Sequence, residues 1–170
     1  MCYLNSGTIK NHCNLEPAIM PKPELVEQLA ETFSQKVPFN KLLGLEFDQL
    51  DRDCCKVHFD NKPELVGNYI QGILHGGVIA SAIDVAGGTM AALGLMQKNP
   101  ESHPEELLDK LSRLGTIDLR IDYVRPGRGK RFETTAKILR TGNKVAVVRM
   151  ELHNEENTLI ALGTGTYLIG

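Results

Sequence analysis

The sequence predicts an α+β domain in which an antiparallel sheet wraps around one long, buried helix. Residues 78–96 are apolar on every side, and a helix with no polar face is buried in a protein or in a membrane. Four stretches with the composition of β-strands follow it, joined by turns typical of antiparallel hairpins. One buried helix followed by successive strands favours the α+β class. These strands are expected at residues 115–124, 131–139, 144–153 and 158–168.

The long helix is expected inside a soluble protein rather than across a bilayer. Its apolar run exceeds the roughly 18 residues at which length alone would allow a membrane span. Asp84 lies near the middle of the run, where an acid costs about 2.5–3.5 kcal/mol on insertion scales. The rest of the chain has the alternating pattern of a soluble sheet. We therefore expect no membrane span.

The same helix is rich in small residues, among them Gly87 and Gly88. Glycine inside a helix costs roughly 0.5–1 kcal/mol relative to alanine, so another interaction must offset this cost. Close approach of the surrounding sheet backbone is the expected reason. Because Gly87 and Gly88 follow Asp84 on the helix, they are also expected to leave room for a bound chain.

The chain divides into an N-terminal extension, residues 1–37, and a main domain, residues 38–170. After an irregular start, the extension carries one amphipathic helix from Pro23 to about Lys36. Alternation is clearest in the strand at 115–124, where Ile117, Leu119, Ile121 and Tyr123 form the apolar set. The other expected elements are a helical turn at 39–43, strands at 45–50 and 54–59, a loop at 61–71, and an inserted helix at 100–113 with Leu107, Leu108 and Leu111 on one side.

Composition excludes several classes of protein. The net charge of −2 gives no drive toward nucleic acid or membrane, and tryptophan is absent. No Cys-x-x-Cys pair occurs, so we expect no zinc site, and nothing in the sequence indicates a cofactor. The start lacks the basic and apolar segments of a signal peptide. Free thiols in a reducing cytoplasm are therefore expected for Cys2, Cys13, Cys54 and Cys55.

Two features of the long helix suggest chemistry. Asp84 is an acid in an apolar helix, which fits either a hydrogen-bonded core acid or a general base or nucleophile. Gly76 and Gly77 place bare N–H groups at the positive end of the helix dipole, where an anion or a developing oxyanion binds. Asp84 lies eight residues after Gly76, about 12 Å along the axis. One helix cannot bring both groups to one carbon atom, whereas two antiparallel copies could.

These residues resemble a known family. The run from Gly72 through His75, Gly76 and Gly77, with Asp84 nine residues after His75, is similar to the hotdog-fold acyl-CoA thioesterases of the PaaI/YigI-like type. The segment 116–126 also resembles that family, and the likeness extends over residues 39–168. It implies a hotdog fold, a homodimer or a dimer of dimers, and acyl-CoA as substrate.

The resemblance also implies roles for the residues. Asp84 would activate a water or attack the thioester carbonyl, while the Gly76 amide of the dimer mate binds the oxyanion. His75 would support the site. A Ser or Thr at the position of Thr116 hydrogen-bonds the catalytic centre in some relatives, and the alternative for Thr116 is an ordinary strand residue.

The loop before the helix departs from the family pattern. Many relatives carry an asparagine six residues before the histidine, where it helps to orient the water. Here Tyr69 occupies that position and Asn68 precedes it. Asn68, Tyr69 and Gly77 are candidate substrate-binding residues, and the water-orienting group stays open. Apolar side chains of this loop, Leu65, Val66, Tyr69 and Ile70, are expected to line the acyl entrance.

Basic residues gather around the turn that begins at Pro126. A solvated charged loop is one interpretation of Arg125, Arg128 and Lys130, with Arg131 beside them. The other is a grip on the phosphates of coenzyme A.

The predicted function is hydrolysis of medium- or long-chain acyl-CoA in fatty acid metabolism. A hydratase or dehydratase on the same fold is one alternative, because His58-Phe59 and Lys62-Pro63 resemble part of the signature of acyl-carrier-protein dehydratases. Asp84 lies farther from His58 than the acid does in that family, and the Pro-Gly of the signature is missing. A non-catalytic acyl-CoA-binding module is the other alternative, although no DNA-binding segment accompanies the domain.

Overall fold

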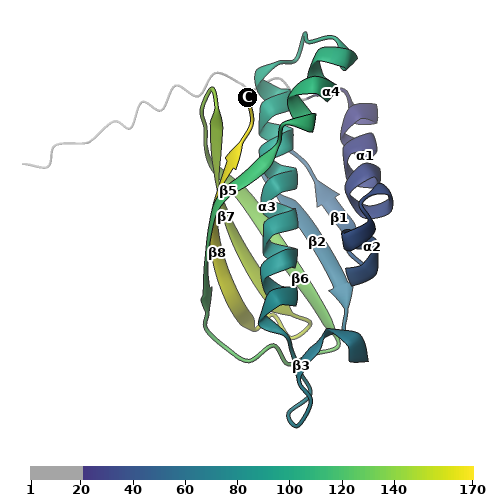
Figure 1. The fold of residues 1–170 in the computed structure, drawn as a ribbon, viewed down its shortest axis with the longest axis vertical. Coiled ribbons are helices and arrows are strands. Elements are labelled where there is room, and N and C mark those ends of the chain that lie inside the picture. The colour runs from purple at the N-terminus through teal and green to yellow at the C-terminus, as the bar shows by residue number, and fades with distance from the viewer. Residues whose placement is uncertain (1–20) are drawn as a thin grey trace, which may run out of the picture.

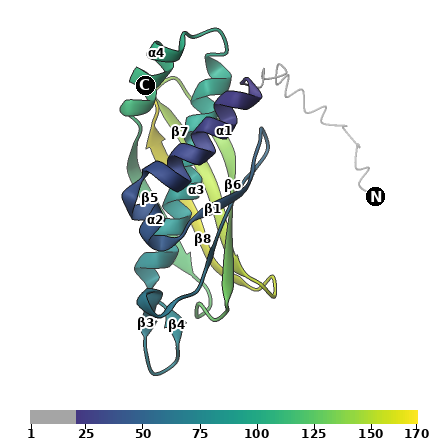
Figure 2. The same ribbon diagram turned by 90° about the vertical axis from the view of Figure 1, so that its right-hand side faces the viewer.

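A computed structural model describes residues 21–170 of the chain, so Cys2 and Cys13 lie outside the described residues. One antiparallel sheet of six strands, in the order β1-β2-β6-β7-β8-β5, curves around the long helix α3 (Figures 1 and 2). The strands are β1 (Glu46–Leu50), β2 (Cys55–Asp60), β5 (Gly115–Tyr123), β6 (Arg131–Thr141), β7 (Val145–Asn154) and β8 (Leu159–Leu168). The α-helices are α1 (Pro23–Glu31), which a π-helical turn continues to Lys36, α2 (Pro38–Leu43), α3 (Gly76–Lys98) and α4 (Pro104–Ser112).

The predicted central helix is confirmed, but its two halves differ in burial. Every residue from Ala86 to Met96 is buried, whereas several earlier side chains of α3 are partly exposed. α3 is long and apolar enough to cross a bilayer, yet 67% of its most apolar window lies inside the fold. The sheet therefore replaces lipid as the apolar surroundings of this helix.

The glycines of α3 at positions 87, 88 and 94 are approached by side chains of the sheet, not by its backbone as predicted. A Cβ added at Gly87 would collide with the hydroxyl of Tyr167 and lie 2.8 Å from its ring carbon Cζ. On the facing strand, a Cβ at Gly163 would lie 2.5 Å from Ile83 Cγ2. Tyr167 fills the space beside Gly87, so the expectation that this glycine leaves room for a bound chain is wrong for the chain as folded.

The predicted loop at 61–71 contains short elements that the sequence pattern did not indicate. A 3₁₀ turn, Pro63–Leu65, leads into β3 (Val66–Asn68), which pairs with β4 (Ile73–Leu74) as a small hairpin. Strands of two or three residues are too short to give a detectable alternation. Gly72, with φ of 62°, provides the left-handed conformation that the end of the turn requires.

The edge strand β5 does not bury its apolar side chains as a core strand would. A register shift between Thr116 and Asp118 marks a bulge, and it leaves Ile117 58% exposed. Tyr123, at the other end of β5, is 53% exposed. The edge strand therefore exposes two large apolar side chains, Ile117 and Tyr123, in the single chain.

Two further expectations concern α4 and the cysteines. Leu107 is buried and Leu111 partly buried, but Leu108 is 69% exposed, so it does not share their face as predicted. Cys54 and Cys55 are buried free thiols. Burial raises the pKa of both thiols, so they stay neutral at physiological pH.

The contact between Gly87 and Tyr167 makes a stability prediction. Gly87→Ala should lower the free energy of unfolding by about 1–3 kcal/mol, because the new methyl group overlaps a buried, rigid ring. The neighbouring Gly88→Ala is the matched control. Its Cβ would lie 3.6 Å from the same ring, an ordinary contact distance, and alanine has a higher helix propensity than glycine. Urea melts of both variants measure the difference. Equal stability of the two variants would show that the ring moves aside.

Candidate functional site

The first turn of α3 is shaped by His75. Its ring nitrogen Nδ1 accepts a hydrogen bond from the Gly77 N–H at 2.9 Å, so His75 caps the helix. The His75 backbone N–H bonds the Leu65 carbonyl at 2.8 Å, which fixes the cap against the preceding turn. Within residues 21–170 no hydrogen bond uses the N–H of Gly76, so this donor remains available at the helix N-terminus.

Asp84 and Thr116 are brought together, as the resemblance implied. The Thr116 hydroxyl donates to Asp84 Oδ1 at 2.9 Å, which joins α3 to the edge strand β5. Asp84 is partly exposed, so it is not an acid enclosed in the core, which was one of the two alternatives. The reason is its position on the side of α3 that the sheet does not cover, with Ser81 and Val85, which are also partly exposed.

Two tyrosines hold the backbone beside these groups, and sequence reasoning missed both roles. The Tyr123 hydroxyl donates to the Gly76 carbonyl at 2.9 Å, and the Tyr167 hydroxyl donates to the backbone carbonyl of Asp84 at 3.3 Å. Burial raises the pKa of Tyr167, and the nearby Asp84 charge raises it further, so its hydroxyl stays a neutral donor. The only sequence signal was the pair of glycines opposite Tyr167, which indicates a bulky neighbour without naming it.

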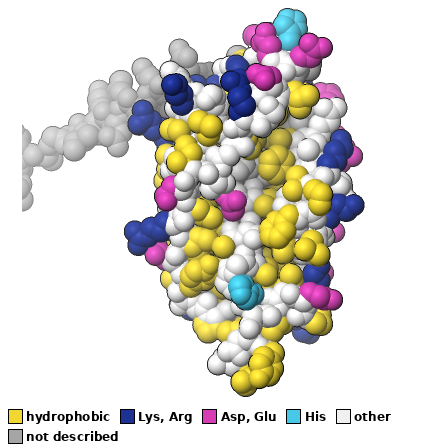
Figure 3. Space-filling view, viewed as in Figure 1, with side chains coloured by type: hydrophobic (Ala, Val, Ile, Leu, Met, Phe, Trp, Pro, Cys, Tyr) yellow, Lys and Arg dark blue, Asp and Glu magenta, His cyan; other side chains and the backbone are white. Residues whose placement is uncertain are grey.

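Gly76 and Asp84 remain apart in one chain. They lie on the same helix, about 12 Å apart along its axis. The surface around them is largely apolar: Figure 3 shows hydrophobic side chains over much of the face along which α3 runs, with few charges between them. Ile117, Tyr123 and Val124 are exposed by 58%, 53% and 45%. An apolar surface of this kind is typical of a binding or subunit interface.

The candidate residues before the helix lie at the tip of the β3–β4 hairpin. The side-chain oxygen Oδ1 of Asn68 accepts a hydrogen bond from the Gln71 N–H at 3.1 Å, so the Asn68 side chain closes the turn. Tyr69 and Ile70 are 87% and 80% exposed, whereas Leu65 is buried. Only part of the predicted apolar lining is therefore inside the chain, and Tyr69 and Ile70 project from it.

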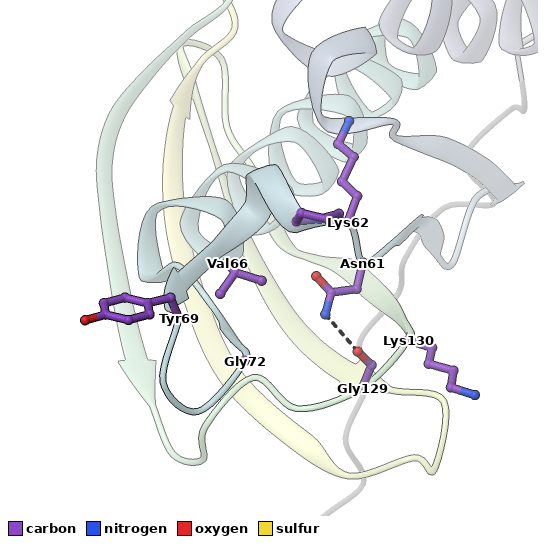
Figure 4. Close-up of a pocket in the computed structure, with 8 residues that line it drawn as sticks. Asn61, Lys62, Val66, Tyr69, Gly72, Gly129 and Lys130 are labelled. Atoms are coloured by element: carbon purple, nitrogen blue, oxygen red, sulfur yellow. Dashed lines mark hydrogen bonds between the residues drawn. The ribbon is translucent and has the colours of Figure 1, made fainter.

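The three basic candidates have different surroundings. Arg125 donates to the Leu159 carbonyl at 3.0 Å. Arg128 donates to both the carbonyl and the side chain of Gln71, at 3.1 and 2.7 Å, and so ties the β5–β6 loop to the hairpin. The ammonium group of Lys130 extends into solvent (Figure 4).

His58, the histidine on which the dehydratase alternative depends, is paired with Asp48. His58, on β2, is nearly buried, and its Nδ1 lies 2.6 Å from Asp48 Oδ2. β2 is on the other side of the sheet order from β5, which carries Thr116. His58 therefore shares a hydrogen bond with β1 and none with Asp84.

Comparison with known proteins adds independent findings. A model of the thioesterase superfamily matches residues 71–161. YigI of Escherichia coli K12, a medium/long-chain acyl-CoA thioesterase, is 47% identical over 153 residues, which are 90% of this chain and 99% of YigI. A crystal structure from Shewanella oneidensis, described as related to the thioesterase superfamily, is 52% identical with a TM-score of 0.84 and covers 86% of this chain and 96% of its own. A thioesterase-like protein of Syntrophus aciditrophicus is 41% identical with a TM-score of 0.77, over 86% of this chain and 97% of its own.

Proposed function

This chain belongs to the thioesterase superfamily, has its hotdog fold and is a thioester hydrolase, and on that premise we propose that it hydrolyses medium- or long-chain acyl-CoA. The products are a free fatty acid and coenzyme A. The similarity to YigI over nearly its whole length supports this substrate class. We place the activity in cytoplasmic fatty acid metabolism, in keeping with the free thiols of Cys54 and Cys55.

One observation carries the assignment of the reacting group. Asp84 is a partly exposed carboxylate on an apolar surface, and the Thr116 hydroxyl fixes one of its oxygens at 2.9 Å. With Oδ1 held in this way, Oδ2 is the oxygen that we assign to the reaction. An oriented carboxylate in apolar surroundings is suited to act as base or nucleophile.

The reaction has two forms that use the same residues. As a base, Asp84 takes a proton from water while the water oxygen attacks the thioester carbonyl carbon. The carbonyl oxygen becomes an oxyanion that the Gly76 N–H of the partner subunit stabilises. The intermediate then breaks its C–S bond and the thiolate of coenzyme A takes the proton. As a nucleophile, Asp84 attacks the carbonyl carbon, and the C–S bond breaks so that coenzyme A leaves as a thiolate and an anhydride remains. Water then hydrolyses the anhydride, which releases the fatty acid, restores the Asp84 carboxylate and supplies the proton that the thiolate takes up.

A homodimer would bring Gly76 of one subunit close to Asp84 of the other. The 12 Å between Gly76 and Asp84 along one helix prevents a single chain from using both groups on one carbonyl. Pairing two α3 helices in opposite directions places Gly76 of one subunit beside Asp84 of the other. The exposed apolar residues of β5, Ile117 and Tyr123, would be covered in such a dimer, and two dimers would form a tetramer.

The rest of the site is assigned to binding. His75 and Gly77 hold the first turn of α3, and the hairpin residues Asn68 and Tyr69 border the entrance. The basic residues Arg125, Arg128 and Lys130 bind the phosphates of coenzyme A, since guanidinium and ammonium groups bind phosphate strongly.

Free-thiol release from acyl-CoAs of graded chain length tests the activity and the role of Asp84 together. Asp84→Asn should lower kcat by roughly 10²–10⁴-fold, because asparagine keeps an oxygen for Thr116 but takes no proton and forms no anhydride. Circular dichroism should show an unchanged fold. Normal turnover by the variant would remove Asp84 from the mechanism. Acyl-CoA binding without thiol release by the natural chain would favour a hydratase or a binding module.

A substitution at Gly76 tests the oxyanion donor. Gly76 is the first residue of α3, a position that favours proline, and its added Cβ would be 3.5 Å from Tyr123. Gly76→Pro removes the N–H and should lower kcat by roughly 10²–10³-fold. Gly76→Ala keeps the N–H and is the matched control. Equal kcat values for the two variants would contradict the assignment.

Mixing inactive variants tests whether the site is shared. A mixed dimer of Asp84→Asn and Gly76→Pro chains contains one site with an intact Asp84 and an intact Gly76. Mixing the chains after unfolding and refolding them together should restore part of the activity that each lacks alone. An inactive mixture, shown by native mass spectrometry to contain mixed dimers, would exclude the shared site.

The basic residues predict a change in substrate affinity. Replacing Arg125 and Arg128 with alanine should raise KM for acyl-CoA more than it lowers kcat, because their charges bind the leaving group and not the reacting carbon. Steady-state kinetics at low salt give both constants. An unchanged KM would show that these residues belong to a solvated charged loop that does not bind the substrate.

A further inference from the structure

Tyr123 joins the end of β5 to the first turn of α3. Its hydroxyl donates to the Gly76 carbonyl at 2.9 Å, and a Cβ added at Gly76 would lie 3.5 Å from its ring. The side chain is 53% exposed, so Tyr123 lies at the surface of the chain and not in its core. The mechanism described above gives Tyr123 no part in the reaction.

Two contacts between α3 and β5 determine where Tyr123 would lie in the proposed dimer. In each chain Asp84 is bonded to Thr116. Gly76 is bonded in the same way to Tyr123, farther along the same strand. If Gly76 of one subunit lies beside Asp84 of the other, two-fold symmetry carries the residues bonded to these groups to the same place. Each site would then contain both bonded pairs, one from each subunit.

The oxygen of Tyr123 keeps the capacity to accept a hydrogen bond. A phenol hydroxyl has one proton to donate, and its oxygen also accepts. The proton is directed to the Gly76 carbonyl, and within residues 21–170 no group donates to this oxygen in return. Tyr123 is therefore an acceptor of fixed orientation at the start of α3.

A water molecule that attacks a thioester needs an acceptor of this kind. In the proposed reaction one O–H of the water points to Asp84 Oδ2, which takes its proton. A second acceptor has to hold the other O–H, so that a lone pair of the water oxygen faces the carbonyl carbon. The sequence left this second acceptor open.

The other candidates near the helix start are less suited to hold the water. His75 Nδ1 already accepts from the Gly77 N–H, so in the neutral ring Nε2 carries the proton and donates. Tyr69, at the position where many relatives carry asparagine, is 87% exposed at the tip of the hairpin. The side-chain oxygen of Asn68 is bonded to the Gln71 N–H.

We propose that Tyr123 orients the attacking water by accepting a hydrogen bond from it, in a site whose Asp84 belongs to the other subunit. The inference rests on the proposed function. The water donates one O–H to Asp84 Oδ2 and the other to the Tyr123 oxygen. This arrangement serves both forms of the reaction, because water attacks the thioester carbon in one and the anhydride in the other.

Competition between water and hydroxylamine tests this role. Hydroxylamine attacks the acyl carbon through its nitrogen, whose lone pair is available without loss of a proton, and gives a hydroxamic acid after the thiolate has left and taken a proton. Tyr123→Phe keeps the ring beside Gly76 and removes only the hydroxyl. With octanoyl-CoA, and with the reaction in the absence of enzyme subtracted, the variant should raise the ratio of hydroxamate to fatty acid by roughly 3- to 10-fold. Structural damage would lower both products together, and an unchanged ratio would overturn the inference.

Ser81→Ala is the matched control. Ser81 is partly exposed, three residues before Asp84, and its hydroxyl also donates to a main-chain carbonyl, that of Gly77, at 2.7 Å. It lines a cavity beside α2 that no residue of β5 borders. The product ratio of Ser81→Ala should therefore equal that of the natural chain. An equal rise in Ser81→Ala and Tyr123→Phe would overturn the inference.

Mixed dimers test whether Tyr123 acts across the subunit boundary. Refolding Tyr123→Phe together with Asp84→Asn gives mixed dimers with one site in which both residues are intact. Fatty acid release per mole of Tyr123→Phe chain should therefore rise when the inactive Asp84→Asn chain is added. No rise, with mixed dimers shown by native mass spectrometry, would overturn the inference. A natural chain that hydrolyses no acyl-CoA would end the proposed function and this inference with it, whereas an active natural chain with an unchanged product ratio in Tyr123→Phe would end the inference alone.

Discussion

The contact of Tyr167 with α3 sets the position of the helix on the sheet. The side chain is 1% exposed, occupies the space that Gly87 leaves free, and donates to the Asp84 carbonyl. Because protein cores are close-packed, a ring fitted against a glycine allows little sliding of the helix. The same contact that stabilises the core therefore fixes the height at which Asp84 meets Thr116 on β5. Stability and the geometry of the site depend on one residue of the last strand.

The helix separates these two tasks along its length. From Ala86 to Met96 it is fully buried and serves as the centre of the core, while its first half keeps one side open. The open side carries the two groups that we propose take part in the reaction, Asp84 and the N–H of Gly76. The hairpin and β5 border this side. A site placed on the half-covered end of a rigid core helix is held precisely and still reached by a substrate.

Much of this arrangement could be predicted from the sequence. The strands after α3 end within two residues of their predicted positions, because strong alternation and the Gly142-Asn143 turn mark them. The pairing of Thr116 with Asp84 followed from family resemblance. The roles of Tyr123 and Tyr167 could not be predicted, because their hydroxyl groups bond main-chain carbonyls 47 and 83 residues away. Local patterns carry no information about such partners.

The order of elements along the chain has a consequence for synthesis. α3 ends at residue 98, yet β6, β7 and β8, which cover it, follow only between residues 131 and 168. At 5–20 residues per second, the 70 residues from there to the end of β8 (168 − 98) take roughly 4–14 s to make. During that time a helix apolar enough to enter a bilayer lacks most of the sheet that will bury it, because only β1 and β2 of that sheet precede it. Asp84 lowers its affinity for lipid, so the acid that we assign to the reaction also disfavours insertion of the nascent helix into a membrane.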